Sequence, residues 1–186
     1  IAETLTERKF VFNALPSVPL ELNSIVKTAK SPKGVIPGES LLNQQFIRQN
    51  FAEQLAKGYK IVHIASHFSI NAGDASRSFL LLGDGTTLTV SDLNTDAAFK
   101  DKFDVELLTL SACDTAVGET DSNGKEVEGF AYVAQQNGAR AIIATLWAVS
   151  DESTALLMSE FYRIKKATPN LTKAEAIQLA QKAMIE

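Results

Sequence analysis

Short apolar runs alternate with amphipathic stretches along this chain. Three runs have the length and the β-branched content of strands buried in a parallel sheet, and they cover residues 59–65, 105–110 and 139–146. Apolar residues at helical spacing, together with capping signals, predict helices over residues 20–29, 43–57, 91–99, 127–137 and 151–166, and after a capping box at 172–175. The order of these elements predicts an α/β fold with a mostly parallel central sheet flanked by helices.

Three further segments complete the predicted fold. Residues 9–14 form another strand candidate, and the prolines and glycines within residues 31–38 indicate a loop. Residues 79–82 and 86–90 are both rich in strand-forming residues and are separated by the sequence GDG, which is typical of a β-hairpin. We therefore expect one small hairpin in addition to the central sheet.

Composition and charge narrow the classes of function. A chain of 186 residues, 45% hydrophobic and 22% charged, fits a single globular domain over residues 1–186. The net charge of −4 gives no electrostatic reason to expect a nucleic acid as a partner. No apolar run approaches the roughly 18 residues of a membrane span, and no charged-then-apolar leader opens the chain, so we expect neither membrane insertion nor secretion. No pattern in the chain indicates a metal or another cofactor.

The cysteine content and the first residue add two expectations. A single cysteine excludes an internal disulfide and suits a reducing compartment, so we expect a cytoplasmic protein with a free thiol. The chain begins with Ile1 and not with methionine. We therefore expect it to be a fragment of a longer protein.

Candidate chemistry lies where two of the predicted strands end. Cys113 follows the strand at 105–110, and His67 follows the strand at 59–65. In open parallel sheets the active crevice lies outside the carboxyl ends of the strands, so neighbouring strands would bring these two side chains together. An imidazole beside a thiol takes its proton and stabilises the thiolate, which predicts a Cys-His dyad. The alternative for Cys113 is a small buried apolar residue. His63 alternates with apolar neighbours inside its strand, and we interpret it as a packed or hydrogen-bonded strand residue.

Three segments together resemble the CHAT domain, a caspase-like cysteine peptidase family that often follows tetratricopeptide repeats. They are HIASHF at 63–68, LSACDT at 110–115 and GARAIIATLWAVSDESTALLMSEFY at 138–162. The resemblance runs in register from about Leu41 to the C-terminus. It implies a caspase-like three-layer fold, a catalytic histidine at His67, a catalytic cysteine at Cys113, and an oxyanion hole formed by the backbone N–H groups of Phe68 and Cys113.

Phe68 departs from the family pattern, which usually has glycine directly after the catalytic histidine. Phenylalanine still supplies a backbone N–H, but it lacks the freedom of glycine to reach positive φ. A misaligned oxyanion hole that lost one donor would cost on the order of 100- to 1,000-fold in rate. An inactive or weak enzyme therefore remains an alternative.

The segment LWAVSD at 146–151 resembles the equivalent piece of separase, a related caspase-like peptidase. In that protein the aspartate receives a basic side chain of the substrate, which implies the same role for Asp151, with Trp147 as an apolar wall. Alternatively, Ser150 caps a helix and Asp151 complements its dipole. Asp114 is a second candidate for binding substrate, although a carboxylate beside the thiol would raise the thiol pKa and oppose its activation.

These observations predict a cysteine endopeptidase that cleaves protein or peptide substrates, after a basic residue if the separase resemblance holds. A repeat-bearing region or another regulatory partner is expected from the family. The alternative is a catalytically inactive caspase-like module for interaction or signalling. A serine acyl hydrolase ranks last, because the chain contains no G-x-S-x-G motif.

Overall fold

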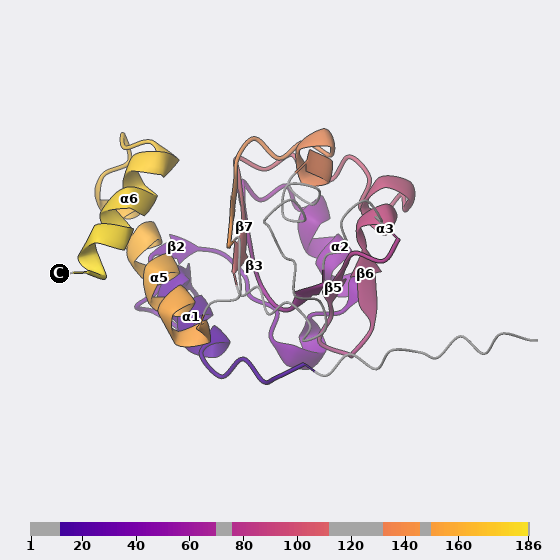
Figure 1. The fold of residues 1–186 in the computed structure, drawn as a ribbon, viewed down its shortest axis with the longest axis horizontal. Coiled ribbons are helices and arrows are strands. Elements are labelled where there is room, and N and C mark those ends of the chain that lie inside the picture. Colours follow the sequence, from indigo (N-terminus) through magenta and orange to yellow (C-terminus); the bar gives the residue numbers. More distant parts are fainter. Residues whose placement is uncertain (1–11, 70–75, 112–131, 146–149, 186) are drawn as a thin grey trace, which may run out of the picture.

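The structure is a computed structural model, and it describes residues 12–69, 76–111, 132–145 and 150–185. Its main sheet has three parallel strands, β3 (Ile61–Ala65), β7 (Leu107–Ser111) and β8 (Ile142–Ala144), in the order β3-β7-β8 (Figure 1). These strands confirm the three predicted runs: β3 and β7 each begin two residues later than expected, β7 ends one residue later, and β8 is shorter than expected within the described residues. The fold of the described residues is therefore mixed α/β, as the sequence predicts.

The central strand β7 explains why both faces of this sheet are covered. All five of its residues are buried. Successive side chains of a strand point to opposite faces, and Leu107 accordingly joins one apolar cluster whereas Leu108 and Leu110 join another. A strand with no solvent-exposed face requires a layer of covering structure on each side.

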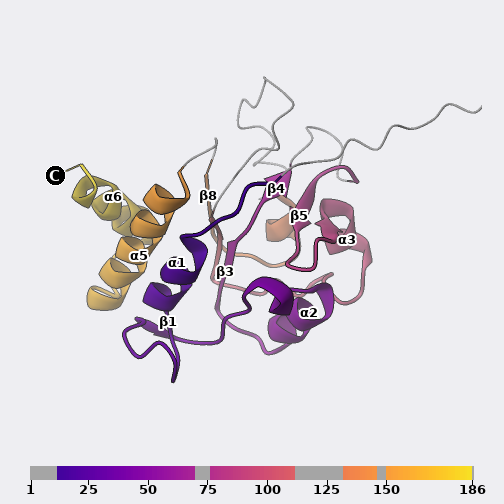
Figure 2. The ribbon, with the colours of Figure 1, turned by 90° about the horizontal axis from the view of Figure 1, so that it is seen from below.

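Helices cover the two faces of the sheet (Figures 1 and 2). One face carries α1 (Val18–Ile25), α5 (Asp151–Ala167) and α6 (Lys173–Ala183). The other face carries α2 (Arg48–Ala56) and α3 (Val90–Thr95). The core against α2 and α3 is built around Phe51, Leu55, Leu93, Phe99 and Phe103, and the core against α1, α5 and α6 around Ile25, Met158, Phe161 and Tyr162. The specific three-layer topology of caspases stays a prediction.

A second, antiparallel sheet follows β3 directly. It consists of β4 (Phe68–Ser69), β5 (Phe79–Leu81) and β6 (Thr87–Thr89), in that order. The hairpin between β5 and β6 confirms the prediction from the GDG sequence, and β4 is an addition to it. Because β4 begins one residue after His67, the hairpin sheet holds the backbone on which this histidine lies.

Several boundaries differ from the sequence-based expectations. The predicted loop 31–38 contains β2 (Ile36–Pro37), which pairs in parallel with β1 (Val26–Lys27). The predicted helix 43–57 is interrupted: η1 (Asn43–Gln45), a 3₁₀ turn that starts with a positive φ of 48°, precedes α2. The strand expected at 9–14 is wrong for its described part, since residues 12–14 are neither strand nor helix; the remainder lies outside the described residues.

The helix starts follow from their capping side chains. The predicted cap at Ser91 is wrong: α3 begins two residues earlier than expected from it, because Thr89 and Asp92 form a reciprocal capping box. Ser150 and Thr172 cap α5 and α6 as predicted. Of the helix expected at 127–137, residues 132–136 are described and are helical.

Candidate active site

The register of the parallel sheet aligns the two strand ends that the sequence singles out. Ala65 of β3 pairs with Ser111 of β7, and the N–H of Ser66 donates to the carbonyl of Ser111 over 3.3 Å. His67 and Cys113 each come two residues after this pair in the sequence. The two chain segments that carry the proposed dyad therefore leave adjacent strands at the same edge of the sheet. Cys113, Asp114 and Trp147 themselves lie outside the described residues.

His67 is buried and held by the segment that precedes α1. Only 5% of its surface is exposed. Its Nε2 lies 2.7 Å from the backbone carbonyl oxygen of Asn13, and the ring of Phe12 lies 5.0 Å from its ring, centroid to centroid. A carbonyl can only accept a hydrogen bond, so Nε2 carries the proton and, in the neutral imidazole, Nδ1 is the basic nitrogen. The Asn13 carbonyl thereby selects the tautomer of the candidate base.

Phe68 is a core residue in an extended strand. It is only 2% exposed, belongs to the core that includes Phe51, and pairs with Leu80 of β5. The N–H of Leu81 donates to the carbonyl of His67 over 2.9 Å, which fixes the backbone just before Phe68. Among the described residues, the non-glycine residues with positive φ are Asn43 and Asp101. The backbone at position 68 therefore does not need the conformational freedom of glycine.

Asp151 lies in the first turn of α5, where the sequence places it. Its Oδ2 accepts a hydrogen bond of 2.6 Å from the N–H of Ser17, the residue before α1. Its Oδ1 is buried and has no hydrogen-bond partner within the described ranges. One carboxylate oxygen of Asp151 therefore connects α5 to the start of α1, and the other is an acceptor that a ligand could use.

A cavity of about 660 Å³ runs along β3, the edge strand of the main sheet. Every residue from Tyr59 to His67 contributes to its lining, and its walls include Leu22 of α1 and Leu55 of α2. Figure 2 shows these two helices on either side of β3. Asp151 does not line this cavity. The cavity and the acidic side chain are thus separate features of the site region.

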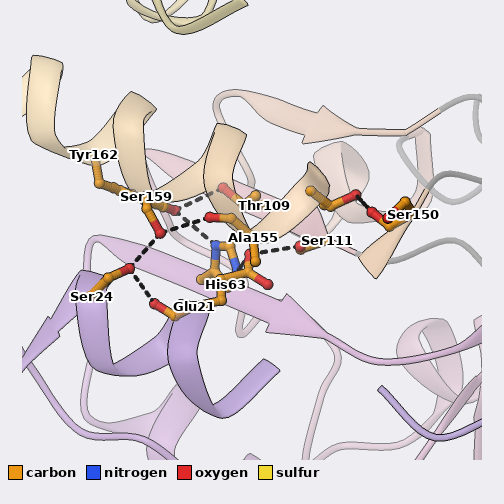
Figure 3. A network of polar contacts seen from close by, with 10 residues as sticks. Glu21, Ser24, His63, Thr109, Ser111, Ser150, Ala155, Ser159 and Tyr162 are labelled. Atoms are coloured by element: carbon orange, nitrogen blue, oxygen red, sulfur yellow. Dashed lines mark hydrogen bonds and ion pairs between the residues drawn. The ribbon is translucent and has the colours of Figure 1, made fainter. Parts of the chain in front are cut away.

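A buried polar network joins α1 to both site strands (Figure 3). Oε1 of Glu21 lies 2.9 Å from Nε2 of His63 and accepts a hydrogen bond of 2.7 Å from the hydroxyl of Ser111. The hydroxyl of Tyr162 lies 3.3 Å from Nδ1 of His63 and 2.8 Å from Oγ1 of Thr109. Burial raises the pKa of Tyr162 above its usual value. His63 is therefore a hydrogen-bonded strand residue, as predicted.

Sequence reasoning missed Glu21 and Asn13. Glu21 could have been noticed, because it lies on the helix face of Val18, Leu22 and Ile25, all of which are buried. A carboxylate on an apolar helix face must find buried partners. Asn13 acts through its backbone carbonyl, which every residue type has, so the sequence could not have pointed to it.

Two features that other classes of function would need are absent from the described residues. Among the described residues, no group of three or more His, Cys, Asp or Glu side chains could hold a metal ion. In the same ranges, no helix combines the length and the apolar character needed to cross a membrane.

Comparison with known families gives the class of the protein. The model of the CHAT domain matches residues 2–186, essentially the whole chain. The chain therefore belongs to the CHAT domain family, which is a caspase-like, protease-related family. Comparisons with curated proteins and with solved structures gave no match. The resemblance seen in the three sequence segments is confirmed at the level of the family.

Proposed function

We propose that this CHAT domain is a cysteine endopeptidase with a dyad of His67 and Cys113. The observation that carries the proposal is the pairing of Ala65 with Ser111, because it starts both dyad segments from the same level of adjacent strands. The bond from His67 Nε2 to the Asn13 carbonyl adds support, since it leaves Nδ1 as the nitrogen that accepts a proton.

In the proposed reaction His67 acts in turn as base and acid, and Cys113 is the nucleophile. Nδ1 of His67 takes the thiol proton, and the thiolate of Cys113 attacks the scissile carbonyl. The backbone N–H groups of Phe68 and Cys113 donate to the oxyanion of the tetrahedral intermediate. His67 then returns the proton to the leaving amine, and water hydrolyses the thioester with His67 again as the base. The Asn13 carbonyl stabilises the imidazolium that forms in each step.

Substrate preference for a basic residue is a further part of the proposal. Oδ1 of Asp151 is the buried acceptor that a lysine or arginine side chain could reach, with Trp147 as the wall over its alkyl part. Asp114 is a second acid close in sequence to Cys113. A lysine or arginine in the substrate is expected to be preferred over its neutral isostere, and the Asp151→Asn variant should lose that preference.

The second candidate function is an inactive interaction or signalling module, controlled through a repeat-bearing or other regulatory partner. The observation that favours it is the burial of His67, which is 5% exposed and lies beside the ring of Phe12. Because so little of this residue is exposed, a substrate could contact the imidazole only after the chain around it moved. In this second function the fold is kept and the reaction is lost.

Thiol reactivity and peptide cleavage separate these two functions. Cys113→Ala and His67→Ala should abolish cleavage of a peptide library, while circular dichroism shows an unchanged fold. In the parent, alkylation of Cys113 should show an apparent pKa well below the usual value of about 8.5, and His67→Ala should return it toward that value. Equal cleavage by the parent and both variants would refute the dyad. A folded parent with an unperturbed thiol that cuts no peptide would support the interaction module.

A further inference from the structure

We propose that Glu21 is a positioning residue for the proposed dyad, acting through the end of β7. The proposal rests on the proposed function, because it concerns the placement of Cys113. Glu21 is on α1, is 1% exposed, and shares one carboxylate oxygen between His63 of β3 and Ser111 of β7. One side chain therefore holds both strands from which the dyad segments start.

Ser111 is the link between Glu21 and the site. It is the last residue of β7, fully buried, and two residues before Cys113. Its hydroxyl donates to Glu21, and its carbonyl accepts from the N–H of Ser66, the residue before His67. The position of Ser111 is thus fixed from the side chain by α1 and from the backbone by β3. A shift of Ser111 would move the point from which the Cys113 segment begins.

Stability alone does not explain a carboxylate at this place. Oε2 of Glu21 is buried and has no hydrogen-bond partner within the described part of the chain. A buried carboxylate that is only partly satisfied costs folding free energy, and well-packed apolar side chains often stabilise such a site as well or better. What the carboxylate provides is direction, because charge-assisted hydrogen bonds are short and oriented.

Thr109 of the same polar network provides a matched control for Ser111. Thr109 is on the same strand and the same face as Ser111, is also fully buried, and bonds to Tyr162 and not to Glu21. Loss of either hydroxyl removes one buried hydrogen bond from the same layer. Only the loss at Ser111 removes the tie between Glu21 and the strand end.

The experiment compares Ser111→Ala, Ser111→Thr, Glu21→Gln and Thr109→Val in the whole chain. The rate of Cys113 alkylation by iodoacetamide is measured against pH, together with kcat and KM on a cleaved peptide and the midpoint of thermal unfolding. We expect Ser111→Ala and Glu21→Gln to lower kcat about tenfold at similar KM and to raise the apparent pKa of alkylation. Ser111→Thr keeps a hydroxyl and should retain most of the parent kcat and of the parent alkylation pKa. Thr109→Val should lower the unfolding midpoint about as much as Ser111→Ala, while leaving the alkylation profile unchanged.

Two outcomes would overturn the proposal. One is an alkylation profile that does not change in Ser111→Ala, and the other is an equal change in Ser111→Ala and Thr109→Val. Failure of the proposed function looks different: the parent cuts no peptide, yet its alkylation profile still responds to Ser111→Ala. In that case Glu21 positions the Cys113 segment of a domain that is not a peptidase.

Discussion

Restoring the glycine of the family at position 68 should destabilise this domain. Phe68 is 2% exposed and packs in the core that includes Phe51 and Leu80. Removal of a buried phenylalanine side chain costs about 3–5 kcal/mol in the free energy of unfolding. Glycine in a strand adds about 0.5–1 kcal/mol through its backbone entropy. At about 2–4 °C per kcal/mol for a domain of this size, Phe68→Gly should lower the unfolding midpoint by about 10–20 °C.

Thermal and urea unfolding of three variants would test this reasoning. Phe68→Leu keeps an apolar side chain of similar size and should lose only about 1–2 kcal/mol. Tyr132→Ala removes an aromatic ring that is 63% exposed and should change the free energy of unfolding by about 0.5 kcal/mol or less. A Phe68→Gly protein within about 1 kcal/mol of the parent would refute the placement of Phe68 in the core. Such a result would also favour the alternative in which glycine forms a better oxyanion hole at this position than phenylalanine.

Two further predictions concern single sites away from the dyad. A Cβ atom at Gly83 would lie 1.8 Å from the carbonyl oxygen of Asn43, so Gly83→Ala should lower the unfolding midpoint strongly. Gly38→Ala is the control, because its Cβ would meet only a side-chain carbon at 3.4 Å, and it should leave the unfolding midpoint nearly unchanged. Equal losses of unfolding free energy in urea titrations of the two variants would contradict the close contact at Gly83. Burial raises the pKa of Tyr162, so this phenol stabilises the fold fully below its unfolded pKa of about 10, and that contribution is lost as pH rises through the folded pKa. Ultraviolet titration of the parent against Tyr162→Phe should show one tyrosine that ionises only with unfolding; a phenol that titrates normally in the folded protein would disprove its burial.

The sequence was sufficient where a pattern acts through side-chain periodicity. The three apolar runs became the strands of one parallel sheet, and the alternation around His63 placed that residue inside β3, where the structure shows it hydrogen-bonded to Glu21. The caps at Ser150 and Thr172 were predictable, because a hydroxyl before a helix accepts from a backbone N–H two or three residues on. In each of these cases a local rule and the tertiary fold agree.

The sequence was insufficient where the contact joins distant segments or uses the backbone. Nothing in the residue type of Asn13 shows that its carbonyl meets His67. The residue type of Phe68 raised the alternative of a misaligned oxyanion hole, but it did not reveal that this ring packs in the hydrophobic core from an extended strand. The break between η1 and α2 lies at Phe46 and Ile47, whose backbone is not helical, and the apolar spacing of residues 43–57 does not reveal it.

The segment from Asn13 to Glu21 has a consequence for biosynthesis. Its three ties reach 54, 134 and 90 residues along the chain, from Asn13 to His67, from Ser17 to Asp151 and from Glu21 to Ser111. Contacts of such long range can form only after the ribosome has released the later partner, and they are completed late in folding. Two of these ties need no residue beyond Ser111, whereas the third needs Asp151, so a growing polypeptide would carry the histidine and the cysteine before the last tie can form. The segment before and within α1 is therefore expected to be fully anchored only once the start of α5 has been synthesised.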